Sequence, residues 1–85
     1  MTPEAKPDFR LALVRQVEVA VNRASFYLGV PPELSRRASE ALILRMLSRF
    51  PTEEALRAIQ GLQPYLRISA CRQLIRELQR DPECL

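Results

Sequence analysis

Histidine and tryptophan are absent from this 85-residue chain, which also has only two glycines and two cysteines. Histidine is the commonest general base in enzymes, the usual partner of a serine or cysteine nucleophile, and a frequent zinc ligand. With so little glycine, the chain also lacks a glycine-rich loop of the kind that binds phosphate groups. We therefore expect no enzyme activity, no catalytic residues, no metal or other cofactor, and no small-molecule substrate.

Long apolar runs are missing as well. No stretch approaches the roughly 18 apolar residues that span a bilayer, so we expect no membrane partner. Residues 1–7 lack the basic flank and apolar stretch of a secretory signal, which predicts a cytoplasmic location. Because two thiols in that reducing compartment rarely form a framework disulfide, we interpret Cys71 as a small core residue and Cys84 as an incidental thiol.

Length and segment boundaries favour a single domain. We predict a flexible N-terminal segment at residues 1–7, a helical bundle domain at residues 8–80 and a C-terminal tail at residues 81–85. The formal net charge is +3, which is compatible with a nucleic-acid partner but too small to indicate one by itself.

Prolines and glycines divide the chain into four segments with helical periodicity, and no segment alternates like a strand. The predicted helices cover residues 8–28, 31–50, 53–62 and 64–80. Asp8 and Thr52 suit N-caps, Gly29 suits a C-terminal stop, and Pro31 and Pro32 suit a first helical turn. The sequence thus predicts an all-α fold, a compact four-helix bundle whose third helix is short.

Apolar residues mark the face that each helix turns to the core. In the second helix the stretch from residue 41 to residue 50 is apolar nearly all round, so we expect it to be the most buried, with Leu42, Met46 and Leu47 in the core. The core face of the first helix comprises Phe9, Leu13, Val14, Val17, Ala20, Val21, Ala24, Tyr27 and Leu28. That of the fourth helix comprises Leu66, Ile68, Ala70, Cys71, Leu74, Ile75 and Leu78.

The first helix has a second apolar line, which we call the apolar seam: Ala12, Val19 and Phe26 recur every seven residues outside the core face. A small bundle has few ways to bury two faces of one helix, so this helix is either central in the monomer or meets another chain. In the second case Ala12, Val19, Phe26 and the neighbouring Arg23 form a protein interface. The leading hypothesis is a non-catalytic interaction or adaptor module that docks this apolar seam, with its Arg-rich rim, on a protein partner. We expect the module to self-associate, as a homodimer or another homo-oligomer.

An alternative hypothesis comes from the sequence ASFYLGV at residues 24–30, followed by residues 31–38. It resembles the first helix end, the turn and the start of the recognition helix in helix-turn-helix DNA-binding proteins. That resemblance implies a small DNA-binding regulator in which Arg36, Arg37 and Glu40 read the major groove. Basic residues at four-residue steps on the last helix would contact phosphates, namely Arg72, Arg76 and Arg80. A glycine helix stop and a solvated last helix explain the same residues, so both hypotheses stay open.

Overall fold

The computed structural model describes residues 9–80. They form four helices, α1 (Phe9–Leu28), α2 (Pro32–Arg49), α3 (Glu53–Arg57) and α4 (Leu62–Arg80), with no strand among the described residues. This confirms the predicted all-α four-helix bundle with a short third helix. The predicted segment 1–7, the cap Asp8 and the tail 81–85 with Cys84 lie outside the described residues.

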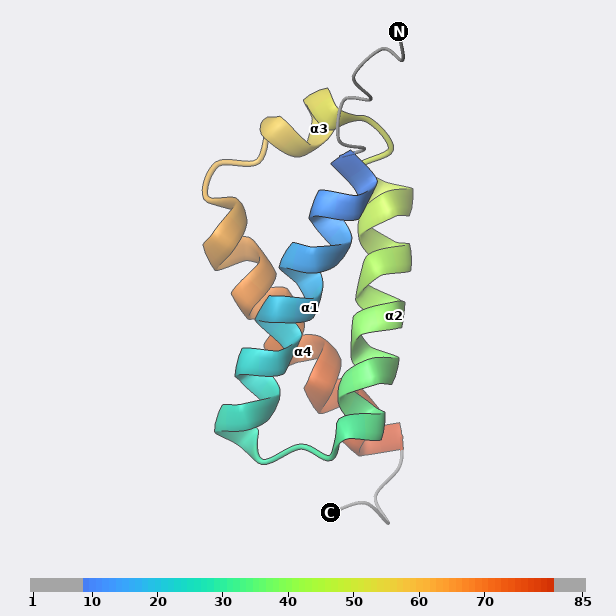
Figure 1. Ribbon diagram of the computed structural model, residues 1–85, viewed down its shortest axis with the longest axis vertical. Helices are drawn as coiled ribbons and strands as arrows, with labels where there is room; N and C mark the ends of the chain where they lie inside the picture. The colour runs from blue at the N-terminus through green and yellow to red at the C-terminus, as the bar shows by residue number, and fades with distance from the viewer. Residues whose placement is uncertain (1–8, 81–85) are drawn as a thin grey trace, which may run out of the picture.

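The three long helices pack against one another, and α3 connects two of them at one end of the molecule (Figure 1). In Figure 1 α1 and α2 lie side by side and run in opposite directions. Helix α4 runs in the same direction as α1 but crosses obliquely behind it, and it ends behind the start of α2. Each long helix is therefore covered by two neighbours on one side only.

Glycine and proline set the boundary between α1 and α2. Gly29 has a φ of 68°, a left-handed conformation that glycine adopts without steric cost, and the Val30 N–H donates to the Ser25 carbonyl at 3.0 Å. This confirms the predicted stop of α1. Helix α2 begins at Pro32, because Pro31 has an extended conformation, with φ −60° and ψ 149°.

The boundary between α3 and α4 differs from the prediction. The Thr52 hydroxyl accepts a hydrogen bond from the Ala55 N–H at 3.1 Å, as expected of an N-cap. Helix α3 then ends at Arg57, short of the predicted residue 62, because the chain turns through Gly61, which has a φ of 72°. Helix α4 starts at Leu62, before the predicted Pro64. Proline is tolerated in that first turn, where its missing N–H breaks no hydrogen bond.

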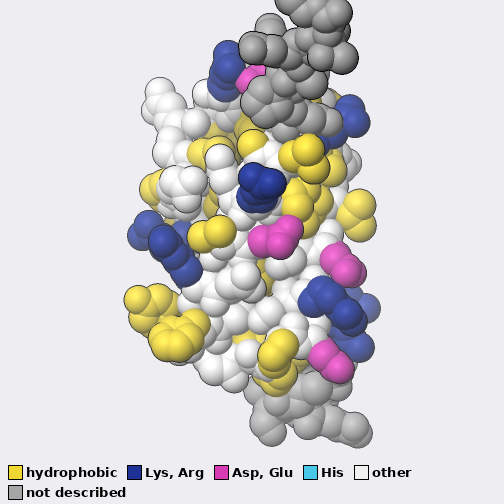
Figure 2. All heavy atoms as spheres, in the orientation of Figure 1, with side chains coloured by type: hydrophobic (Ala, Val, Ile, Leu, Met, Phe, Trp, Pro, Cys, Tyr) yellow, Lys and Arg dark blue, Asp and Glu magenta, His cyan; other side chains and the backbone are white. Residues whose placement is uncertain are grey.

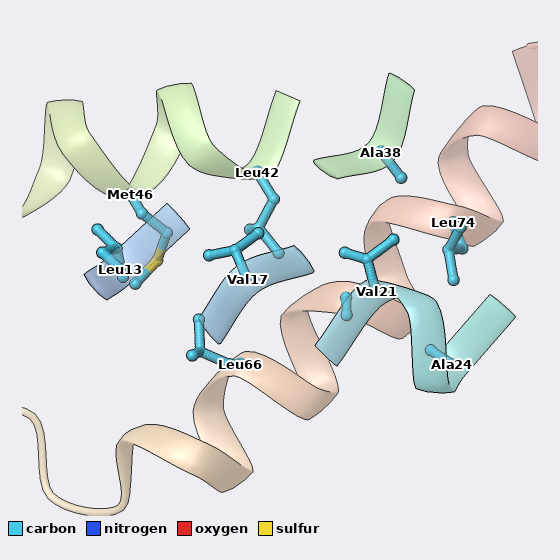
Figure 3. Close-up of a cluster of buried hydrophobic side chains, with 10 residues drawn as sticks. Leu13, Val17, Val21, Ala24, Ala38, Leu42, Met46, Leu66 and Leu74 are labelled. Atoms are coloured by element: carbon cyan, nitrogen blue, oxygen red, sulfur yellow. The ribbon is translucent and has the colours of Figure 1, made fainter. Parts of the chain in front are cut away.

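A single apolar core joins the three long helices (Figure 3). In Figure 3 side chains from α1, α2 and α4 point toward one another. Leu42 and Met46 are buried and Leu47 packs against the core, as predicted. The buried core residues are Leu13, Val17, Val21, Ala24, Ala38, Leu42, Met46, Leu66, Ala70 and Leu74.

Five of the apolar residues that we expected to be buried are exposed instead. Leu44, within the stretch of α2 expected to be the most buried, is 70% exposed. Leu44 lies on the same side of α2 as Arg37 and Glu40, where these residues line a shallow groove between α2 and α4. In the last turn of α1, Ala24 and Ser25 are buried while Tyr27 and Leu28 are exposed. The other four exposed residues are Tyr27, Leu28, Ile68 and Ile75.

Replacing Leu42 by alanine should lower the free energy of unfolding by about 2–5 kcal/mol, because a cavity forms and apolar burial is lost. Leu42 is only 1% exposed. The control, Leu44→Ala, changes the same residue type on the exposed side of the same helix and should cost less than about 1 kcal/mol. Urea denaturation followed by circular dichroism measures both. Equal losses would show that the buried face of α2 is assigned wrongly.

Candidate functional site

The apolar seam of α1 lies on the surface of the chain. Val19 and Phe26 are exposed, with Phe26 82% accessible, and Ala12 and Arg23 are exposed too. The opposite side of α1 carries the fully buried Val17 and Val21. Within the described residues the seam is therefore not part of the monomer core.

Val19 and Phe26 open onto a groove between α1 and α4, which we call the α1/α4 groove. The last turn of α1 adds Tyr27 and Leu28 to it, both of which the sequence had placed in the core. In Figure 2 hydrophobic side chains gather at the lower left, over the C-terminal end of α1, with Lys or Arg side chains above them. The groove is lined by Val19, Ala20, Asn22, Arg23, Ala24, Phe26, Tyr27, Leu28, Gln63, Arg67 and Cys71.

Two aromatic rings dominate this groove. Phe26 and Tyr27 lie edge to face, with ring centroids 6.0 Å apart and an interplanar angle of 79°. Tyr27 is 85% exposed. Gly29 ends the helix two residues later, so both rings stand on the exposed side of the last turn of α1, whose other side carries the buried Ala24 and Ser25. Edge-to-face packing holds the two rings together while most of their surface remains accessible.

The charge around the groove has one sign. Arg23 on α1 and Arg67 on α4 are exposed and line it, whereas no aspartate or glutamate does. Within the described part of the chain, neither arginine forms an ion pair. The charged groups that line the apolar groove are therefore two guanidinium groups.

Helix α4 contributes residues to this groove that sequence analysis did not place there. Arg67 and Gln63 were not singled out, and Cys71 was interpreted as a core residue. Cys71 is half-buried and packs against the core while also lining the groove. No local pattern pairs these residues with α1, because the contact depends on how α4 crosses behind it.

A buried polar pair on α4 was also missed. Gln73 and Glu77 are each 4% exposed, and Gln73 Nε2 donates to Glu77 Oε1 at 3.3 Å. Arg80 Nη1 lies 3.8 Å from the same oxygen. The spacing of Leu66, Ala70, Gln73 and Glu77 by three or four residues follows a single helical stripe, and that spacing could have revealed their burial.

The residues of the DNA-binding hypothesis are exposed, and acidic side chains lie among them. Arg37, Glu40 and Arg80 line a shallow groove between α2 and α4, where the carboxylates of Glu40 and Glu77 lie among the guanidinium groups. Arg72 and Arg76 are exposed on α4 and do not line this groove. The mixed charge does not favour a phosphate-binding site.

The arrangement of α1 and α2 differs from a helix-turn-helix as well. In that motif the two helices cross at about 90–120° and the second projects from the protein. Here they lie alongside each other over their length (Figure 1). Buried serines join them, with Ser35 donating to the Ser25 hydroxyl, and Arg36 lies beside this polar contact. The DNA-binding alternative stays a prediction that these features do not favour.

Other kinds of site are not found in the described part of the chain. Residues 9–80 contain no group of three or more cysteine, aspartate or glutamate side chains placed to hold a metal ion. None of the helices in this range is both long and apolar enough to cross a membrane.

Fold and surface together define a small helical bundle with one apolar, arginine-flanked groove. Comparisons with protein-family models, with curated proteins and with solved structures find no match for this chain. Inferences about its function therefore rest on the chemistry of its own surface.

We expect a random DNA duplex to bind only weakly, with a dissociation constant of about 10⁻⁴–10⁻⁶ M at physiological salt, as for non-specific binding. Fluorescence anisotropy over a salt series measures this. Because Arg36 and Arg37 line grooves that also contain Glu40, Arg36→Gln with Arg37→Gln should weaken binding no more than Arg72→Gln with Arg76→Gln. Sub-micromolar, steeply salt-dependent binding that only the α2 variant loses would instead establish the DNA-binding alternative.

Proposed function

We propose that this chain is a non-catalytic protein-interaction module that docks through the α1/α4 groove. The observation that carries the proposal is the exposure of Val19, Phe26, Tyr27 and Leu28 along one groove. Burying apolar surface is favourable by about 25 cal/mol per Å². Contiguous exposed apolar side chains with a polar surround are typical of protein interaction sites, whereas scattered ones are normal on any protein.

The residue types around the groove fit a protein interface. Binding energy in interfaces concentrates on a few anchors, among which tyrosine and arginine are enriched, and polar residues surround them. Tyr27 and Phe26 supply the aromatic anchors. Asn22, Gln63 and the two groove arginines supply the polar surround. Aromatic side chains have few rotatable bonds, so they lose little conformational entropy when a partner holds them.

The position of the groove on α1 also supports docking. The same helix places Val17, Val21 and Ala24 in the core, so its backbone is held by packing against α2 and α4. A surface presented on a packed helix needs little ordering when it binds, and a preorganised surface binds more tightly for a given contact area. The buried side of α1 therefore holds the helix in the bundle, and its exposed side presents the groove residues to a partner.

The double variant Val19→Glu with Phe26→Glu should abolish association, because it places two carboxylates in the apolar part of the groove. Sedimentation measures self-association, and pull-down from cell extract measures capture of other proteins. Circular dichroism should show unchanged helix content, since both side chains are exposed.

The matched control is Leu11→Glu with Leu44→Glu, which adds the same charge at exposed apolar positions outside the groove. It should associate like the wild type. The proposal is wrong if both variants associate equally well, or if the wild-type chain is monomeric and captures no protein.

A further inference from the structure

We infer that the α1/α4 groove receives an acidic amphipathic helix of a different protein, rather than a second copy of this chain. The inference rests on the proposed function, in which the groove is an interface, and adds the chemistry of the partner. Three features of the groove lead to it: the charge of its two walls, the size of the side chains at its base, and the orientation of its aromatic rings.

The charge of the walls selects an anionic partner. Arg23 stands on one wall and Arg67 on the other, and every other residue lining the groove is uncharged. Neither guanidinium is paired with another described residue. A guanidinium offers a planar pair of donors that matches a carboxylate. A partner helix with acidic side chains on both sides of its apolar stripe would therefore pair one carboxylate with Arg23 and another with Arg67.

The same charge disfavours a second copy of the chain. A two-fold symmetric dimer through this groove would bring the groove against itself, since such interfaces use the same surface on both subunits. Arg23 and Arg67 of both copies would then meet with no acidic residue from either groove. Like charges facing each other across an interface oppose binding. The self-association expected from the sequence is thus disfavoured at this surface.

The base of the groove suits a helix. Ala20 and Ala24 line it and are partly or fully buried, so small side chains lie between the exposed Val19 and Phe26 of α1 and the α4 wall. Small residues let a second backbone approach closely, and an amphipathic helix fills such a groove with apolar residues at i, i+3, i+4 and i+7. Since α3 has only five residues, the incoming helix would complete a bundle of four long helices.

The aromatic rings argue against single-stranded nucleic acid as the occupant. Proteins that bind it stack successive bases on accessible ring faces along a strongly basic groove. Phe26 and Tyr27 are nearly perpendicular, and only two arginines line this groove. Val19 and Leu28 add aliphatic surface to the groove, and such surface contributes little to the binding of bases or phosphates.

The test uses three synthetic amphipathic helical peptides with the same leucine and phenylalanine stripe, flanked by glutamate, glutamine or lysine, and a single-stranded oligothymidine. Fluorescence anisotropy measures their affinities for the full chain. The glutamate peptide should bind tightest, by about tenfold over the glutamine peptide and more over the lysine peptide.

Cys71 reports where the probe binds. In a Cys84→Ser background, the glutamate peptide should slow maleimide modification of Cys71, because this thiol lines the groove. The variant Arg23→Gln with Arg67→Gln should lose the preference for glutamate over glutamine. Arg72→Gln with Arg76→Gln removes the same charge from exposed positions outside the groove and should keep it.

Four outcomes would overturn the inference: no peptide binds, the peptides bind equally, oligothymidine protects Cys71 better than the glutamate peptide, or the chain alone protects Cys71 as its concentration rises.

The proposed function fails separately. If Val19→Glu with Phe26→Glu abolishes native association but the glutamate peptide does not bind, the groove is an interface for a partner of other chemistry. If that variant leaves association intact, the groove is not the interface.

Discussion

The packing of α1 against both α2 and α4 is the constraint on which the rest of the structure depends. Leu13, Val17 and Val21 form a stripe on α1 that is buried by both neighbours at once. A helix can turn only one side to such a core. Because α3 is too short to form a further layer, the opposite side of α1 stays uncovered, and the apolar seam becomes surface.

The parts of the fold that depend on local chemistry could be predicted from the sequence. Gly29 ends α1 and Thr52 caps α3 because the backbone conformation or hydrogen bond at each position needs that residue type. Leu42 and Met46 were placed correctly because they lie where both neighbours cover α2. The seven-residue spacing of Val19 and Phe26 correctly separated them from the core face, and both line the groove, whereas Ala12 of the same seam does not.

The parts that depend on how the helices cross could not be predicted. A helical wheel gives the angular position of Tyr27 and Ile75 but not where the neighbouring helices lie, so both were placed in the core and both are exposed. Gln73 and Glu77 illustrate the converse, since polar side chains on the inner stripe of α4 are buried where α2 covers it. Arg67 lines the groove although it lies far from α1 in the sequence. Helical periodicity gives no information about contacts between two separate helices.

The division of α1 into a buried and an exposed side separates the residues that stabilise the fold from those that we propose contact a partner. A domain this small is stable by only about 5–15 kcal/mol, so changes in the core stripe affect every property that depends on the fold. Phe26 and Tyr27 contribute little to that core, because most of their surface faces solvent. Their side chains can change without loss of the fold, and a partner that covers them would stabilise the folded chain by mass action. Under the proposed function, the groove gains its packing only in a complex.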